Sequence, residues 1–369
     1  MIKAVAVSAC AAGICLLTAC GGCGGSIDYK INTRPNWQIR GSGADDLHEN
    51  SALLTRSERA VYSVSKTEGG NGNVALEYGE GATYEISLGA KTYAWDDESI
   101  PENLRITGNT KYTDYVYVYE TSLTLPGKYT VKGESFEFTN TITSICLFRS
   151  AANGLTPVYS MQDVVCYTPQ SLAPASIDDA YVQLNRVYET WYSRDGAHAE
   201  YSIELREGDN GGDVESGNYS AAVGTQYSLF DANQITAALR AMSQSGSYSF
   251  EVFMPVNGKN SSYQANWGTA TVIDRADAGF AGILGALDGA AESGYIITEP
   301  GEDGKRSYAL TPVTLNLSAE MAGTSSSYYY CSVTNADMNC ERAVLAQINE
   351  TLPFNLGTAQ YKLSSISFE

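Results

Sequence analysis

Hydrophobic and polar residues alternate with a period of two in many short runs along the chain, and glycine, proline and asparagine separate these runs. This alternation is typical of antiparallel β-strands. In residues 115–119 the tyrosines take one face and the valines the other, so we expect this strand to be covered on both sides. The expected strands are 60–64, 74–78, 83–88, 115–119, 187–192, 199–205, 248–253, 263–273, 308–317, 328–333, 344–348 and 360–368. Pro126, Gly127 and Gly133 separate residues 115–119 from the next apolar run, which begins at Phe136.

Two segments have the character of helices. Residues 231–242 begin with Asp231, a good N-cap, and Gln234 three residues later completes a pattern like a capping box. Ile235, Ala238, Leu239 and Met242 share one face, which we expect to pack on a sheet. Residues 278–291 are apolar but contain four glycines, which indicates a weak helix or an ordered loop.

The fold class that follows is mainly β: an antiparallel, curved sheet or half-barrel with one or two short helices. Prolines and small residues interrupt the pattern at 168–178, which suggests two β-rich lobes, 31–172 and 173–369, the second carrying helix 231–242. Strands on both sides of this interruption are equally compatible with one large curved sheet, and the sequence leaves the choice open.

The N-terminus has the pattern of a secretory signal peptide. A short positive start is followed by an apolar run from residue 4 to 17, which is too short for a permanent transmembrane helix. The run ends in Leu17-Thr18-Ala19-Cys20, which resembles the lipobox of bacterial lipoproteins. The resemblance implies cleavage after residue 19, a diacylglycerol on the thiol of Cys20, and a membrane anchor in the cell envelope. Residues 20–30 then form a lipidated, glycine-rich tether; an ordinary signal peptide with a chance cysteine is the alternative.

Cysteine usage agrees with an extracytoplasmic location. Cys146 and Cys166 are 20 residues apart, and Cys331 and Cys340 are 9 apart, so we predict two local disulfides. Cys23, in the predicted tether, is left without a predicted disulfide partner. Neither pair has zinc-site spacing.

Net charge and missing motifs exclude several functions. The 23 basic and 42 acidic residues give a net charge of −19, which disfavours nucleic acid as a partner. Neither histidine, His48 or His198, has the neighbours of a catalytic base, and we predict a chain with no catalytic residues, no cofactor and no metal. The acidic segment 207–215 departs from the EF-hand pattern, so we interpret it as a solvated turn.

The 26 tyrosines are the main compositional excess. Tyr115, Tyr117 and Tyr119 are suited to line a groove that is apolar inside and wet at its rim, although tyrosine also favours half-buried strands for structural reasons. Residues 230–242 and 355–363 resemble uncharacterised surface lipoproteins of gut-type bacteria, and the overall pattern is similar to the half-barrel of periplasmic lipoprotein carriers. These resemblances transfer no catalytic residue. We therefore expect a lipid-anchored, non-catalytic binding protein for a hydrophobic small molecule, a lipid or an envelope protein.

Two other classes remain open. Trp95 lies beside Asp96, Asp97 and Glu98, a combination found in enzymes that hydrolyse carbohydrates with paired carboxylates. A structural or adhesive surface role is the other alternative.

Overall fold

The computed structural model describes residues 7–9, 14–16 and 58–368, apart from gaps at 70–72, 109–111, 152–153, 172, 213, 225–227, 243, 275–276, 295, 298–300, 302–303, 318–325 and 336–339. Cys20, Cys23, His48, all of the predicted tether and most of the predicted signal peptide lie outside these residues, so the predictions made for them stay predictions. Within the predicted signal peptide, β1 (Val7–Ala9) and β2 (Ile14–Leu16) pair as an antiparallel hairpin.

The remaining strands form one large sheet, as the alternating pattern predicts. Their bounds are β3 Glu58–Lys66, β4 Val74–Tyr78, β5 Thr83–Ala94, β6 Thr113–Val131, β7 Glu134–Ala151, β8 Gly154–Pro169, β9 Tyr181–Tyr192, β10 His198–Leu205, β11 Gly217–Ala222, β12 Leu229–Asp231, β13 Ser247–Met254, β14 Lys259–Trp267, β15 Thr271–Ile273, β16 Ile296–Ile297, β17 Tyr308–Leu317, β18 Ser326–Asn335, β19 Cys340–Thr351 and β20 Thr358–Phe368.

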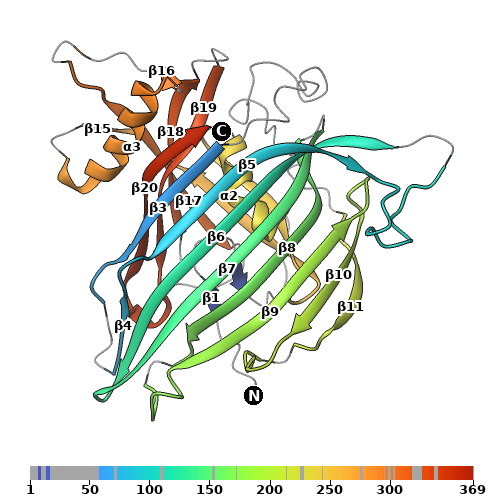
Figure 1. Cartoon of the computed structure of the whole chain (residues 1–369), viewed down its shortest axis with the longest axis horizontal. Helices are drawn as coiled ribbons and strands as arrows, with labels where there is room; N and C mark the ends of the chain where they lie inside the picture. The colour runs from blue at the N-terminus through green and yellow to red at the C-terminus, as the bar shows by residue number, and fades with distance from the viewer. Residues whose placement is uncertain are drawn as a thin grey trace.

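The sheet is mostly antiparallel and strongly curved (Figure 1). Its ladders run in the order β12-β13-β14-β17-β18-β19-β20-β3-β5-β6-β7-β8-β9-β10-β11, with β4 added to β6, β15 to β17 and β16 to β18. Only the β12–β13 ladder among these is parallel. The predicted fold class, an antiparallel curved sheet with short helices, is confirmed.

Strands from both predicted lobes belong to this one sheet. β8 and β9 lie on either side of the interruption at 168–178 and pair along their length, from Tyr159 opposite Trp191 to Pro169 opposite Tyr181. A second junction joins β3 to β20, so the first and last long strands of the described body are neighbours. One buried cluster also contains residues from both halves, from Ala60 to Ile366. The two segments therefore share a sheet and a core.

β6 continues through Pro126 and Gly127, where the sequence indicates a break. Pro126 falls between the β5 ladder, which ends at the pair Thr83–Thr124, and the β4 ladder, which begins at Tyr78–Gly127. A proline nitrogen cannot donate a ladder hydrogen bond, and here it stands at the change of partner strand. The turn to β7 comes later, at Lys132 and Gly133, whose φ angles of 50° and 90° give a two-residue hairpin of the type I′ kind.

The predicted helix 231–242 lies on the concave side of the sheet (Figure 1). It is a 3-10 turn, η2 (Ala232–Gln234), followed by α2 (Ile235–Ala241). The capping box is present: the Asn233 backbone N–H donates to Asp231 Oδ1 at 2.8 Å, and the Asp231 N–H donates to Gln234 Oε1 at 3.3 Å. Every residue of η2 and α2 is buried, so the segment packs on all sides and not through one face alone.

A second helix, α3 (Ala281–Glu292), packs against β20 through Ile283, Leu284 and Leu287. Gly282, Gly285 and Gly289 lie on its exposed side. The glycines therefore do not prevent the helix, because its buried side supplies enough apolar contact. No helix in the described part of the chain is both long enough and apolar enough to cross a membrane.

The outer face of the sheet carries its own small apolar cluster. Trp95, Val116, Leu147 and Val158 are buried together there, while Tyr117 and Tyr119 face the main core. Both faces of the 115–119 strand are thus covered, as its tyrosine and valine alternation predicts.

Both predicted disulfides are wrong. Cys146 lies opposite Ser160, and Cys166 is six residues farther along β8, which is about 20 Å at about 3.3 Å per residue. Cys331 lies opposite Val344, whereas Cys340 lies opposite Asn335, four residues away along the ladder. A disulfide needs Cα atoms within about 7 Å, so the strand register keeps each pair apart.

Candidate functional site

The concave side of the sheet is filled around η2 and α2. The Tyr119 and Thr236 hydroxyl oxygens are 2.6 Å apart in a hydrogen bond, and the Tyr330 hydroxyl donates to the Thr236 carbonyl at 2.8 Å. The Tyr62 hydroxyl donates to the Leu345 carbonyl at 2.8 Å. Tyr119 and Tyr330 of the inner face therefore hold α2 inside the curve, and Tyr62 of β3 reaches across β20 to β19.

A buried ion pair adds to this attachment. Arg240 of α2 donates from Nη1 and Nη2 to the two carboxylate oxygens of Glu58 at 2.8 and 2.9 Å, and both side chains are about 95% buried. Burial alone would lower the pKa of Arg240, but the Glu58 carboxylate outweighs burial and raises it. The ion pair keeps Arg240 charged, and a buried charge of this kind is costly without its partner.

The three tyrosines predicted to bind a ligand lie in or beside this packed interior. Tyr119 contacts α2, Tyr117 stacks on Phe148 with ring centroids 5.5 Å apart, and Tyr115 is half buried against the core. They belong to one strand face, as expected, and the neighbouring residues of the core cover them. Ligand binding by these tyrosines stays a prediction.

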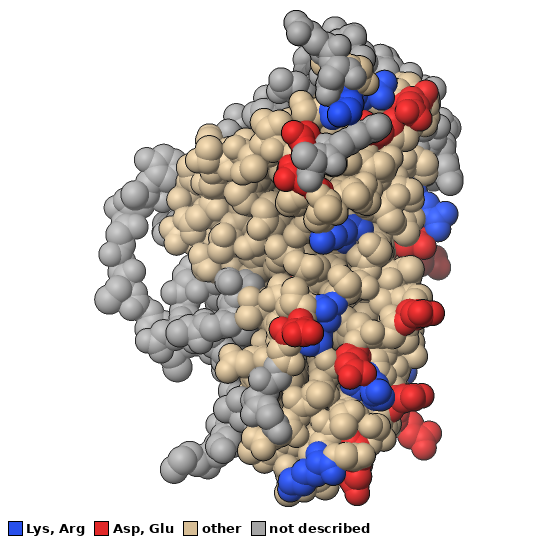
Figure 2. All heavy atoms as spheres, turned by 90° about the vertical axis from the view of Figure 1, so that its left-hand side faces the viewer, with Lys and Arg blue, Asp and Glu red and all other residues tan. Residues whose placement is uncertain are grey.

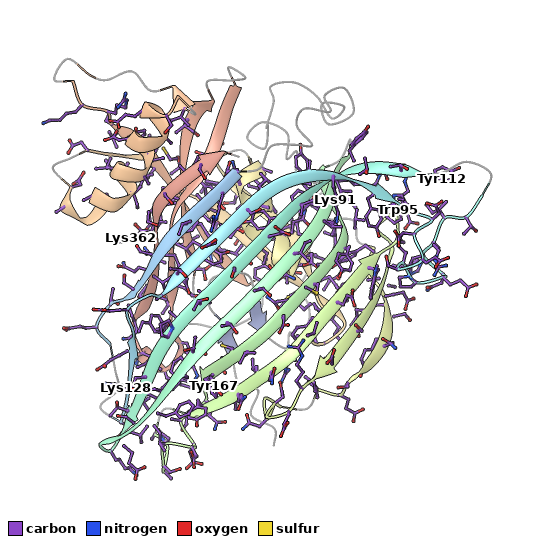
Figure 3. All side chains as sticks on the ribbon, viewed as in Figure 1. Lys91, Trp95, Tyr112, Lys128, Tyr167 and Lys362 are labelled. Atoms are coloured by element: carbon purple, nitrogen blue, oxygen red, sulfur yellow. The ribbon has the colours of Figure 1, made fainter. Side chains whose placement is uncertain are left out.

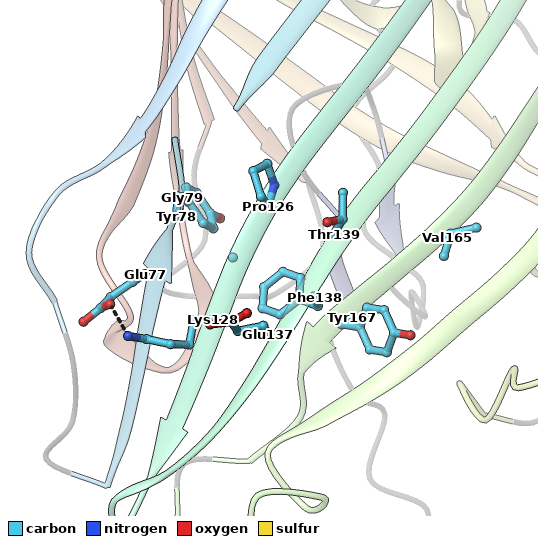
Figure 4. A pocket seen from close by; sticks show the side chains of 11 residues that line it. Glu77, Tyr78, Gly79, Pro126, Lys128, Glu137, Phe138, Thr139, Val165 and Tyr167 are labelled. Atoms are coloured by element: carbon cyan, nitrogen blue, oxygen red, sulfur yellow. Dashed lines mark ion pairs between the residues drawn. The ribbon is translucent and has the colours of Figure 1, made fainter. Parts of the chain in front are cut away.

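An open groove of about 670 Å³ lies elsewhere, near the β6–β7 hairpin (Figure 4). Its apolar lining comes from four strands: Tyr78 at the end of β4, Pro126 of β6, Phe138 of β7, and Val165 and Tyr167 of β8. Glu77, Lys128, Glu137 and Thr139 supply its polar lining. Figure 3 shows Lys128 and Tyr167 near the lower end of the sheet, far from Trp95 and Tyr112.

The polar lining of the groove is ordered by the strand register. Glu77 lies opposite Lys128, and Lys128 lies opposite Glu137, so one lysine stands between two carboxylates. Lys128 Nζ is 3.1 Å from Glu77 Oε2, and both side chains are substantially exposed. Water screens such a pair, so it contributes at most about 1 kcal/mol and is free to exchange partners.

Charges on the surrounding surface are mixed. Figure 2 shows acidic and basic side chains interspersed over the described part of the face at the left of Figure 1. The groove is therefore distinguished by its local charge of −1, from one lysine and two glutamates, and not by a large field of one sign.

Aromatic rings form one wall of the groove and continue behind it. The Phe138 ring lies 4.9 Å from the Tyr129 ring and 5.8 Å from the Tyr167 ring, measured between centroids. Phe136 stacks on Tyr181 at 4.4 Å. Such contacts stiffen the wall, because each ring limits the rotation of its neighbours.

The carboxylates considered for carbohydrate chemistry lie in a loop at the other end of the sheet. Trp95 is fully buried and donates from Nε1 to Asp114 Oδ2 at 2.8 Å, so its ring is covered by protein. Asp97 Oδ1 accepts the Ser99 backbone N–H at 2.9 Å and the Ser99 hydroxyl at 2.7 Å, and these bonds lower the pKa of Asp97. A carboxyl group with a lowered pKa is a poor general acid. Asp96 is partly exposed and Glu98 is exposed.

The acidic segment 207–215 is organised by an internal ion pair. Asp209 accepts from Arg186 Nη2 and Nε at 2.6 and 2.7 Å, and both side chains are buried. Burial favours a higher pKa for Asp209, but the bonds from Arg186 and the Asn185 N–H outweigh it and lower that pKa. No group of three or more potential metal ligands occurs within the described residues. His198 is exposed on β10.

The groove residues escape detection from sequence because they come from separate strands. The paired Phe136 and Phe138, with Pro126 and Gly127, are the only local signals. Placing Lys128 between two glutamates requires the register of three strands, which single-sequence patterns do not supply.

No family model matches the chain, and no curated protein sequence matches it. Among solved structures, it is similar to the beta-barrel-like protein of a domain of unknown function from Brucella abortus, with 9% sequence identity and a TM-score of 0.42. That match covers 86% of this chain and 98% of the other chain.

Proposed function

We propose that this chain is a non-catalytic binding protein of the cell envelope, anchored by lipid at Cys20, whose groove holds an amphipathic ligand. The observation that carries the proposal is the groove itself. Its volume of about 670 Å³ falls within the usual range for small-molecule sites, and apolar residues from β4, β6, β7 and β8 line it beside a short polar row.

The charges of the groove suggest which polar end the ligand has. One lysine between two glutamates leaves a local excess of negative charge, so a cationic end is favoured over an anionic one. The rings of Tyr78, Phe138 and Tyr167 also suit a cation, since an aromatic face attracts positive charge. The alkyl part of the ligand then packs against Pro126 and Val165.

Three probes with the same alkyl chain test this proposal. Decyltrimethylammonium, decanol and decanoate are titrated against the purified full chain below their micelle concentrations, and binding is followed by calorimetry. We expect the cation to bind best and decanoate worst. Equal binding of all three contradicts the charge argument, and no binding of any probe contradicts the binding function and favours a structural or adhesive role.

A matched pair of variants locates the site. Glu137→Gln removes a groove carboxylate and should weaken cation binding about threefold or more, which corresponds to roughly 0.7 kcal/mol. Glu134→Gln changes an exposed glutamate of the same strand outside the groove and should leave binding unchanged. Equal effects of the two variants would place the binding elsewhere.

A further inference from the structure

A band of polar side chains crosses the inner face of the sheet beneath η2. Two adjacent rows of the ladders form it: Tyr119, Cys146, Ser160 and Thr190 in one, and Thr121, Ser144 and Gln162 in the other. All seven are buried. The band stands out because most of the buried residues around it are aromatic or aliphatic.

The segment from Asp231 to Thr236 lies across this band. Ser160 Oγ donates to Asp231 Oδ2 at 2.6 Å, and the Tyr192 hydroxyl donates to the same oxygen. Asp231 Oδ1 accepts the Asn233 N–H, so both carboxylate oxygens are occupied. At the other end of the segment, the Thr236 hydroxyl forms a hydrogen bond with the Tyr119 hydroxyl. The segment is therefore fixed to the band at two points.

Four buried polar atoms of the band and this segment have no hydrogen-bond partner within the described chain: Gln162 Nε2, Thr190 Oγ1, Asn233 Oδ1 and Gln234 Nε2. Their residues are between 0% and 7% exposed. Thr190 lies directly opposite Ser160, and Gln162 is two residues along β8 from Ser160 on the same face, while Asn233 and Gln234 follow the Asp231 that Ser160 contacts. A buried polar group without a partner is costly, so four around one segment point to partners other than the described side chains.

We propose that the band and the 231–236 segment enclose an internal hydration site, in which ordered water links the helix-bearing segment to the sheet. Water matches the four atoms: the two amide N–H groups donate to it, Asn233 Oδ1 accepts from it, and the Thr190 hydroxyl does either. A cation fits poorly, since both oxygens of Asp231 already accept hydrogen bonds. An apolar ligand would leave all four atoms unsatisfied.

The hydration site gives the contact between segment and sheet a particular character. The two ends of the 231–236 segment are held by direct hydrogen bonds, at Asp231 to Ser160 and at Thr236 to Tyr119. The middle of the segment is held to the sheet through exchangeable water. Water bridges are nearly as favourable as direct hydrogen bonds, so the middle is stable without requiring close side-chain fit.

The substitution Thr190→Val tests the site, because valine keeps the shape and removes the hydroxyl. If water bridges Thr190, its loss should lower the midpoint of thermal unfolding of the full chain by about 2 °C or more. Thr168→Val is the matched control: Thr168 is also buried with an unpartnered hydroxyl, but it lies opposite Val182, away from the band. The control should leave the midpoint unchanged or raise it. A rise of equal size in both variants overturns the proposal, because it means that the band is dry.

A crystal structure of the full chain gives an independent readout. Ordered water within hydrogen-bond distance of at least two of the four atoms supports the site, and its loss or displacement in Thr190→Val supports it further. Density showing the four side chains turned to protein partners, with no water among them, overturns it.

Discussion

The ring of Phe138 lies over the backbone of Gly127, its cross-strand partner. A Cβ atom placed on Gly127 would come within 2.5 Å of Phe138 Cζ and 3.1 Å of the Glu77 carbonyl oxygen. Only glycine leaves room for the ring at this position, so the groove wall depends on residue 127 having no side chain.

Gly127→Ala should therefore displace Phe138 and destabilise the chain. We expect a loss of about 1–3 kcal/mol, as for other overpacked positions, measured by denaturant unfolding. Gly108→Ala is the control, because no atom lies within 4 Å of its added Cβ. Equal stability of the two variants would show that the Phe138 ring is not held against Gly127.

Breaking the buried pair of Arg240 and Glu58 should be far more costly than breaking the neighbouring exposed pair. Arg240→Met leaves the Glu58 carboxylate buried without its partner, and we expect a loss of about 3–5 kcal/mol. Arg59→Ala removes the pair with Glu85, which is exposed, and should cost about 1 kcal/mol or less. Similar unfolding midpoints in urea for the two variants would contradict the buried position of Arg240.

Acid should weaken the contact between Asp209 and Arg186. The pKa of Asp209 is lowered in the folded chain, so its contribution is present above the unfolded pKa of about 3.9 and is lost as the pH falls through the lower, folded value. Asp209→Asn should therefore be less stable than the parent at neutral pH, and the difference should shrink below about pH 4. Thermal unfolding of both proteins across this range measures the effect, and a constant difference would speak against it.

The buried thiols should be unreactive until the chain unfolds. Burial raises the pKa of Cys331 to about 12, and burial also raises the pKa of Cys146. Because the thiolate is the reactive form, alkylation at pH 8 should be slow in native protein and fast in denaturant. Mass spectrometry of the alkylated peptides measures the extent of alkylation. Cysteine peptides that remain cross-linked after unfolding without reductant would contradict the free thiols of the structure.

The lipid anchor has a direct test at Cys20. Cys20→Ser should abolish acylation and move the protein from the detergent phase to the aqueous phase in a phase-partition experiment. Cys23→Ser, three residues later in the tether, should remain in the detergent phase. Identical partitioning of the two variants would reject the lipobox interpretation.

Local signals in the sequence predicted local structure well. The Asp231 capping box needs only residues 231–234, and it forms as the pattern indicates. The alternation in residues 115–119 likewise depends on the strand alone, and it predicted that tyrosines and valines take opposite faces and that both faces are covered.

Features that depend on the pairing register of the strands could not be predicted from these local patterns. Cys146 and Cys166 are close in sequence, but long paired strands carry them about 20 Å apart. From the sequence alone, Pro126 is typical of a turn. It lies instead inside β6, at the point where the neighbouring strand changes from β5 to β4. The groove combines both difficulties, since its lining comes from β4, β6, β7 and β8 together.

The ladder between β3 and β20 has a consequence for biogenesis. Ser63 pairs with Lys362, 299 residues later, so β3 lacks this neighbour until the residues of β20 have been synthesised. Folding that must await such a distant contact is slow, and the waiting strand is a template for aggregation. A nascent chain of this kind would benefit from a holding chaperone, and a chain that lacks β20 would leave this edge of β3 without its neighbouring strand.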